Sequence, residues 1–165
     1  MRAAPFLSAI LIAFFPLACG GPASQSGAPE RASVLPRGAE GIDLSHHNGP
    51  VDWPRLSATD RSFVYIKASE GTGLTDPRFQ ENWREALRHG WQAGAYHFYL
   101  LCRGGEAQAE NFIRQVEVRA GTLPPAVDLE HAHNCAPSGP REETLSELRT
   151  FMDALEAEYG AVPVI

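Results

Sequence analysis

Five short apolar runs alternate with longer amphipathic segments in the part of the chain after residue 40. The runs have strand length and cover residues 41–45, 63–68, 93–100, 124–130 and 161–165. Between them, apolar residues recur at helical spacing, as at Phe79, Trp83 and Leu87. We predict helices over 76–89, 106–119 and 141–159, the last with a buried face of Leu145, Leu148, Met152, Leu155 and Tyr159. Strands that alternate with helices predict a parallel sheet with right-handed crossover connections.

Polar residues that suit catalysis fall at the carboxyl ends of the predicted strands: Asp43, Glu70, His97, Asp128 and Glu130. In a (β/α) barrel, that end of the strands carries the active site. An open nucleotide-binding sheet would show the same alternation, but no glycine-rich phosphate loop follows the first strand. The pattern therefore predicts the α/β class, with a TIM-like (β/α) barrel.

The number of strands does not fit a complete barrel. An eight-stranded barrel needs at least about 200 residues, whereas this sequence of 165 residues shows five strands after residue 40. An open five-stranded sheet would leave two unpaired edges. We expect either a fragment of a longer product, which we favour, or a protein that is truncated after the fifth strand and inactive.

Asp128 and Glu130 are the strongest candidates for chemistry. Residues i and i+2 of a strand project from the same face, which places their Cα atoms roughly 6.5–7 Å apart. Two carboxyls this close raise each other's pKa, so that one stays protonated while the other is ionised. Cleavage of a glycosidic bond uses such a pair, because one group protonates the leaving oxygen and the other stabilises positive charge on the sugar. The alternative is that both side chains are solvated or cap the next helix.

The first 40 residues have the composition of a targeting segment and a linker. Arg2 precedes an apolar core over residues 6–17, and Leu17-Ala18-Cys19-Gly20 then resembles a bacterial lipoprotein signal with Cys19 as the lipidated residue. An ordinary cleaved signal peptide is the alternative, and both predict export. Residues 20–40 are rich in Gly, Pro, Ser and Ala, which predicts a flexible linker. We thus expect a signal peptide at 1–19, a linker at 20–40 and a catalytic domain at 41–165, anchored to a membrane of the cell envelope or secreted.

The net charge argues against nucleic acid as a partner. The formal net charge is −6, which leaves no basic surface that would bind nucleic acid.

The cysteines predict a disulfide. If Cys19 carries lipid, Cys102 and Cys135 remain, and each lies five residues beyond a strand-end residue, His97 or Glu130. Neighbouring strands would bring these two thiols together. Export permits disulfides, so we predict a Cys102–Cys135 bond, with two free thiols as the alternative.

Four motifs resemble those of the family-25 glycoside hydrolases, the N-acetylmuramidase lysozymes. They are Gly41-Ile42-Asp43-Leu44-Ser45-His46-His47-Asn48-Gly49 with Val51-Asp52-Trp53, Lys67-Ala68-Ser69-Glu70-Gly71-Thr72, Gly94-Ala95-Tyr96-His97-Phe98, and Val127-Asp128-Leu129-Glu130. All four stand in the family's order and at suitable spacing over residues 41–165. The resemblance implies a modified β/α barrel that needs no metal or other cofactor. It also implies cleavage of the β-1,4 bond between N-acetylmuramic acid and N-acetylglucosamine in the glycan strands of peptidoglycan.

The resemblance further implies roles for single residues. Glu130 maps to the catalytic acid, and Asp128 and Asp43 map to its carboxylate partners. Negative charge on these two partners would keep the proton on Glu130 and stabilise an oxocarbenium-like transition state. The substrate-binding residues that we expect are Tyr65, Glu70, Tyr96 and His97. The Cys102–Cys135 pair is not a general feature of the family.

Two other functions stay open at the level of the sequence. The histidines suggest a metal-dependent amidohydrolase or deacetylase with ligands from His46, His47, His97, His131 and His133. Such barrels usually carry a His-x-His pair on the first strand, where this chain has Asp43. The other alternative is an inactive, truncated lipoprotein that binds cell-wall glycan without cleaving it.

Overall fold

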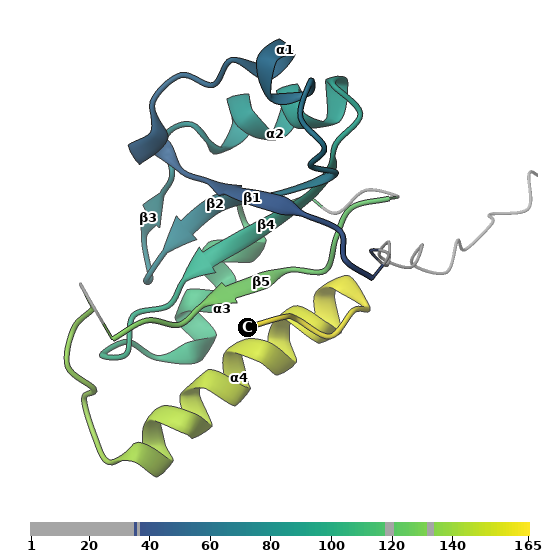
Figure 1. The fold of residues 1–165 in the computed structure, drawn as a ribbon. Coiled ribbons are helices and arrows are strands. Elements are labelled where there is room, and N and C mark those ends of the chain that lie inside the picture. Colours follow the sequence, from purple (N-terminus) through teal and green to yellow (C-terminus); the bar gives the residue numbers. More distant parts are fainter. Residues whose placement is uncertain (1–34, 36, 118–120, 132–133) are drawn as a thin grey trace, which may run out of the picture.

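A sheet of parallel strands forms the centre of the protein. The computed structural model describes residues 35, 37–117, 121–131 and 134–165. The parallel strands are β1 (Gly41–Leu44), β2 (Phe63–Glu70), β4 (Gln92–Phe98) and β5 (Ala126–Asp128), in the spatial order β1-β2-β4-β5 (Figure 1). Their connections contain η1 (His46–Asn48), α1 (Trp53–Leu56), α2 (Phe79–Arg88) and α3 (Gly105–Ile113), and α4 (Arg141–Tyr159) follows β5. The predicted α/β class and parallel sheet are confirmed.

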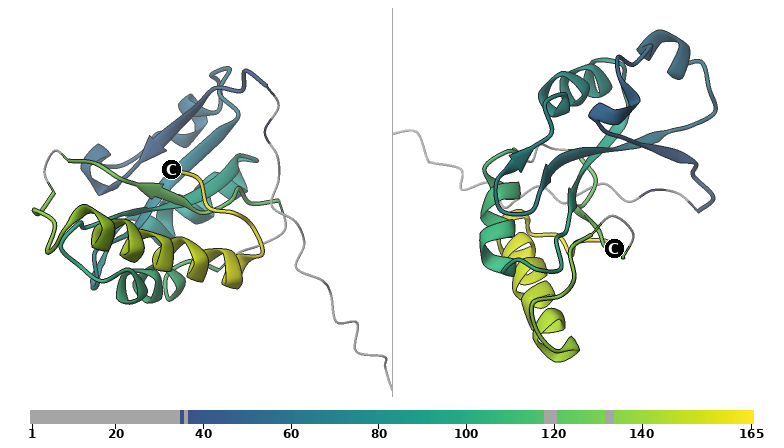
Figure 2. Two further views of the ribbon diagram at one scale, coloured as in Figure 1. Left: turned by 90° about the horizontal axis from the view of Figure 1, so that it is seen from below. Right: turned by 90° about the vertical axis from the view of Figure 1, so that its left-hand side faces the viewer.

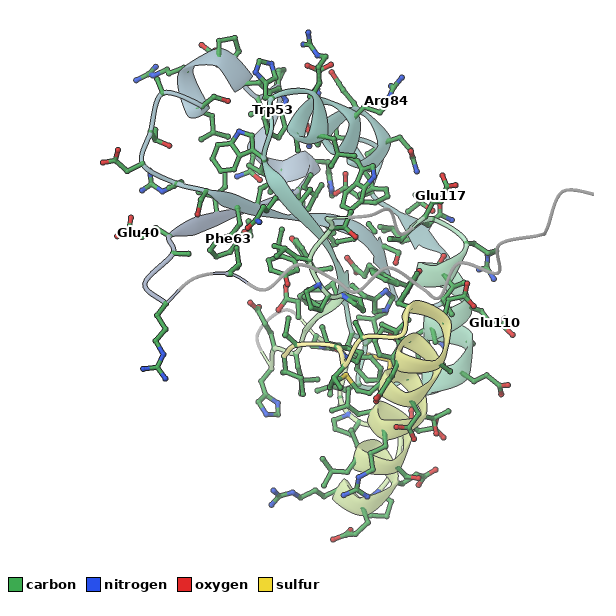
Figure 3. All side chains as sticks on the ribbon, turned by 90° about the vertical axis from the view of Figure 1, so that its right-hand side faces the viewer. Glu40, Trp53, Phe63, Arg84, Glu110 and Glu117 are labelled. Carbon is green, nitrogen blue, oxygen red and sulfur yellow. A yellow bond between two sulfur atoms is a disulfide. The ribbon has the colours of Figure 1, made fainter. Side chains whose placement is uncertain are left out.

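The two faces of the sheet differ in polarity. Alternate residues point to opposite faces of a strand, and the residues on the helical side form a buried core with Phe79, Phe112 and Phe151. That side includes Val64, Ile66, Ala93, Ala95 and Val127. Figure 2 shows α3 and α4 side by side on this face. Outer-surface side chains of α2 and α3, such as Arg84 and Glu110, extend into solvent (Figure 3). The other face of the sheet carries polar side chains and is only partly covered.

α4 has the predicted bounds and most of the predicted buried face. Gly160 ends it with a left-handed conformation, φ 64°. Leu148, Leu155 and Tyr159 are buried as predicted, and Met152 is partly buried. Leu145 is 38% exposed, and Phe151, which the prediction left out, is fully buried. The N-terminal end of α4 extends beyond the sheet (Figure 1).

Several other boundaries differ from the prediction. α2 begins at Phe79 because the Asp76 carboxylate accepts a hydrogen bond from Arg78 N and forms a turn ahead of the helix. α3 ends at Ile113, where Gln115 N and Val116 N both donate to Phe112 O. A two-residue strand, β3 (Leu74–Thr75), pairs antiparallel with β2 and was too short to predict.

The predicted fifth strand, residues 161–165, makes only an isolated parallel bridge between Ala126 and Val164. Val164 donates to Pro125 O and accepts from Val127 N, while Val162 and Ile165 are exposed. None of the helices in the described part of the chain is both long and apolar enough to cross a membrane. The predicted signal peptide and Cys19 lie outside the described residues.

Candidate active site

Asp43, Asp128 and Glu130 line a single hollow of about 290 Å³ on the polar face of the sheet. Tyr65 and Tyr96 also line it. The register of the sheet explains the grouping, because Asp43 pairs with Tyr65 on β2, and Tyr96 pairs with Ala126, two residues before Asp128. The sequence predicted Glu130 on the strand, but β5 ends at Asp128 and Glu130 lies just beyond it. The chain still brings both carboxyls to the same hollow.

Negative charge is concentrated in this hollow. Burial and the charge of Glu130 raise the pKa of the Asp128 carboxyl, and Asp43 adds to the rise. The positive charge of Lys67 partly opposes it. Lys67 is 5% exposed, and its Nζ lies 2.7 Å from Glu70 Oε2 and 4.8 Å from the centre of the Phe98 ring. A positive charge that develops on a bound sugar ring would be stabilised by these carboxylates.

The two tyrosines provide neutral hydroxyl groups beside the carboxylates. Burial raises the pKa of Tyr65 to about 12, and its hydroxyl donates to Pro124 O at 3.1 Å. Burial, together with the charges of Asp43 and Asp128, raises the pKa of Tyr96. Both side chains therefore keep their protons at neutral pH.

His97, which we expected as a substrate contact, does not line the hollow. The adjacent Tyr96 faces the hollow, so His97 points to the opposite, helical side, where it is 0% exposed. Its Nδ1 lies 2.8 Å from Ser69 Oγ and its Nε2 lies 3.3 Å from Gln108 Oε1. Burial lowers the pKa of His97 to about 4, although the hydrogen bond with Gln108 favours the protonated form.

Glu70 is half-buried at the end of β2, where it is ion-paired with Lys67. It is outside the set of residues that line the hollow. Its contact with substrate stays a prediction, and in the structure its ion pair fixes the position of the Lys67 charge.

Asp76, the first residue of the helix predicted over 76–89, is a buried carboxylate whose charge acts on Tyr96. Its Oδ2 accepts from His46 N at 2.9 Å and contacts His46 Nδ1 at 2.8 Å, while Oδ1 accepts from Arg78 N. Burial by itself raises the pKa of Asp76, but these hydrogen bonds outweigh it, so the pKa is lowered. Asp76 thus ties the loop after β1 to the start of α2. The partner of Asp76, His46, is thirty residues away in the sequence, so a pattern of neighbouring residues could not reveal the contact.

The histidines do not assemble into a metal site within the described ranges. No group of three or more His, Cys, Asp and Glu side chains there is arranged to hold a metal ion. His46 is engaged with Asp76, and His97 with Ser69 and Gln108. His133 lies outside the described residues.

Cys102 and Cys135 form a disulfide, which is the predicted pairing, with their Cα atoms 5.7 Å apart. The bond joins the loop that follows β4 to the loop that follows Glu130. Both loops lie at the carboxyl ends of the strands, beside the hollow. The larger neighbouring hollow, of about 540 Å³, shares Glu130 but is lined mainly by apolar residues of these loops and of α4.

Comparison with known proteins places these features in one family. The sequence model of the glycosyl hydrolases family 25 matches residues 42–165. The chain is 36% identical to Lysozyme M1 of Streptomyces globisporus over 142 residues, which are 81% of this chain and 47% of that protein. It is 30% identical to an N,O-diacetylmuramidase of Chalaropsis sp, over 76% of this chain and 64% of that protein. The chain therefore spans about half the length of the first curated relatives that it matches.

Comparison of the fold with solved structures indicates the same family. A family 25 glycosyl hydrolase from Bacillus anthracis superimposes with a TM-score of 0.71 and 33% identity, over 84% of this chain and 65% of that chain. A bacterial lysozyme from Streptomyces coelicolor gives a TM-score of 0.69 and 32% identity, over 77% of this chain and 62% of that chain. The family match covers all of the strands and helices that build the hollow. This chain belongs to the glycosyl hydrolases family 25.

Proposed function

We propose that this protein is a peptidoglycan hydrolase that cleaves the β-1,4 bond between N-acetylmuramic acid and N-acetylglucosamine. The observation that carries the proposal is the grouping of Asp43, Asp128 and Glu130 around one hollow at the carboxyl ends of parallel strands. The names of the relatives, a lysozyme and an N,O-diacetylmuramidase, support the same reaction.

In the proposed reaction, Glu130 protonates the glycosidic oxygen of the leaving sugar. Asp128 and Asp43 stabilise the positive charge that develops at the anomeric carbon. Tyr96 and Tyr65, on the wall of the hollow, contact the sugar rings. Burial and the neighbouring charges of Glu130 and Asp43 raise the pKa of Asp128. This concentration of negative charge favours a cationic transition state over a neutral ground state.

Analysis of the reaction products tests this proposal. After incubation of the protein with peptidoglycan, mass analysis of the soluble muropeptides is expected to show new reducing ends on N-acetylmuramic acid. A chelator is expected to leave the rate unchanged. Released peptides or deacetylated glycan, with loss of activity on chelation, would instead indicate the metal-dependent alternative. Binding to peptidoglycan without any cleavage would indicate a wall-binding protein.

We also propose that residues 1–19 direct export, that Cys19 carries a lipid anchor, and that residues 20–40 link the anchor to the catalytic domain at 41–165. The support is the apolar core of residues 6–17 followed by Leu17-Ala18-Cys19-Gly20. Replacing Cys19 with Ser is expected to move the protein from the membrane fraction to the soluble fraction. An unchanged distribution would exclude a lipid on this residue and leave the ordinary signal peptide.

A further inference from the structure

Glu130 lies beyond the last residue of β5, where strand pairing no longer fixes the backbone. β5 ends at Asp128, and the hydrogen bond from Tyr99 N to Asp128 O, 3.0 Å long, continues the pairing of the two chains just beyond β4. Glu130 is two residues further on, and it is exposed. An acid that must meet a glycosidic oxygen within hydrogen-bond reach needs its backbone fixed. The contacts that fix it come from a side chain.

The carboxamide of Asn134 bridges the two chains at this point. Its Nδ2 donates to Tyr99 O at 2.7 Å and to Glu130 O at 2.9 Å. Its Oδ1 accepts from Leu101 N at 3.0 Å. A parallel ladder would next join Glu130 N to Tyr99 O, and Leu101 N to Glu130 O. The carboxamide therefore binds three of the four groups that the next rungs would use, and it acts as an inserted peptide group between the two chains.

The disulfide holds Asn134 at this position. Cys135 is the next residue, and it is bonded to Cys102 on the loop that follows β4. Cys102 N also donates to Cys135 Sγ at 3.1 Å. The loop that carries the carboxamide is thus fastened to the end of β4, against which the carboxamide holds Glu130.

We propose that Asn134, anchored by the Cys102–Cys135 disulfide, is the positioning residue for the catalytic acid: its carboxamide fixes the backbone of Glu130 against the end of β4. This inference rests on the proposed function, in which Glu130 is the acid. A displacement of the acid by about 1 Å lowers the rate by about a hundredfold. Substrate binding in the hollow depends mainly on other residues, so the effect falls on kcat rather than on KM.

The test uses Asn134→Asp with Ser138→Ala as its matched control. Aspartate keeps the size of the side chain and the acceptor for Leu101 N, but it loses both donors. Ser138 lies on the same loop and also makes a hydrogen bond from its side chain to the backbone, yet its partner is Cys102 O at 3.0 Å. We expect Asn134→Asp to lower kcat by about ten- to a hundredfold with KM within about twofold of the wild-type value. Ser138→Ala is expected to keep both constants.

Hydrogen exchange provides a readout that is independent of catalysis. The backbone amides of Tyr99 and Leu101 donate to Asp128 O and to Asn134 Oδ1, and they are expected to exchange faster in Asn134→Asp than in the wild type or Ser138→Ala. An unchanged kcat, a change confined to KM, an equal loss in the control, or unchanged exchange would each overturn the inference. If the wild-type protein cleaves no peptidoglycan, the proposed function fails, and the exchange rates alone decide whether Asn134 holds this segment.

Discussion

Replacing Glu130 with Gln is expected to lower kcat for peptidoglycan cleavage by about 10²–10⁴-fold, the usual contribution of a general acid. Glutamine has nearly the same shape and can still form hydrogen bonds in the hollow, but it has no acidic proton to give to the leaving oxygen. Because the contacts of the sugar with the tyrosines are retained, KM is expected to change little. The measurement is the rate at which new reducing ends appear in a suspension of peptidoglycan.

The control for this variant is Glu106→Gln, which makes the same chemical change at an exposed position in the first turn of α3. It is expected to keep the wild-type rate. If Glu130→Gln retained more than a tenth of the activity, the acid would have to be another carboxyl of the hollow. Asp128 would then be the next candidate, because its pKa is raised. The matching replacement Asp128→Asn would decide between the two.

The free energy of unfolding is expected to fall by about 3 kcal/mol between pH 7 and pH 4 because of His97. In the folded protein, burial lowers the pKa of this side chain from 6.5 to about 4. Between those two values the unfolded chain binds a proton at His97 and the folded protein does not. The contribution of His97 to the free energy of unfolding is therefore fully present above pH 6.5. It falls as the pH decreases and is lost by about pH 4. Urea denaturation at a series of pH values measures it.

His97→Gln separates this effect from the titration of other groups. Glutamine does not titrate, so the variant's stability should depend less on pH in this range, whatever its absolute value. The lowered pKa of Asp76 stabilises the fold, and this stabilisation is lost only as the pH falls below 3.8. The raised pKa of Asp128 acts in the opposite direction, since it makes the fold more stable as the pH falls towards 3.8. An equal loss of stability in wild type and variant between pH 6.5 and pH 4 would show that His97 is not the cause.

Local pattern was sufficient to predict much of the fold. The parallel strands were predicted from apolar runs of strand length. Buried strands produce such runs, and the amphipathic helices between them produce apolar residues at helical spacing. The bounds of α4 followed from its apolar spacing and from Gly160. Asp43, Asp128 and Glu130 were found because site residues of this architecture follow strand ends. The two cysteines were found because their loops follow neighbouring strands.

The sequence by itself therefore determined the class of fold, the carboxylates of the site and the pairing of Cys102 with Cys135. Only the tertiary structure decided which face of β4 His97 occupies, that Phe151 rather than Leu145 is buried on α4, and that Asp76 and Asn134 bind distant backbone groups. The physical reason is the range of the contacts. Periodicity and capping depend on neighbours within about one helical turn or strand step. Folding alone brings His97 to Gln108, Asp76 to His46, and Asn134 to Tyr99 and Leu101.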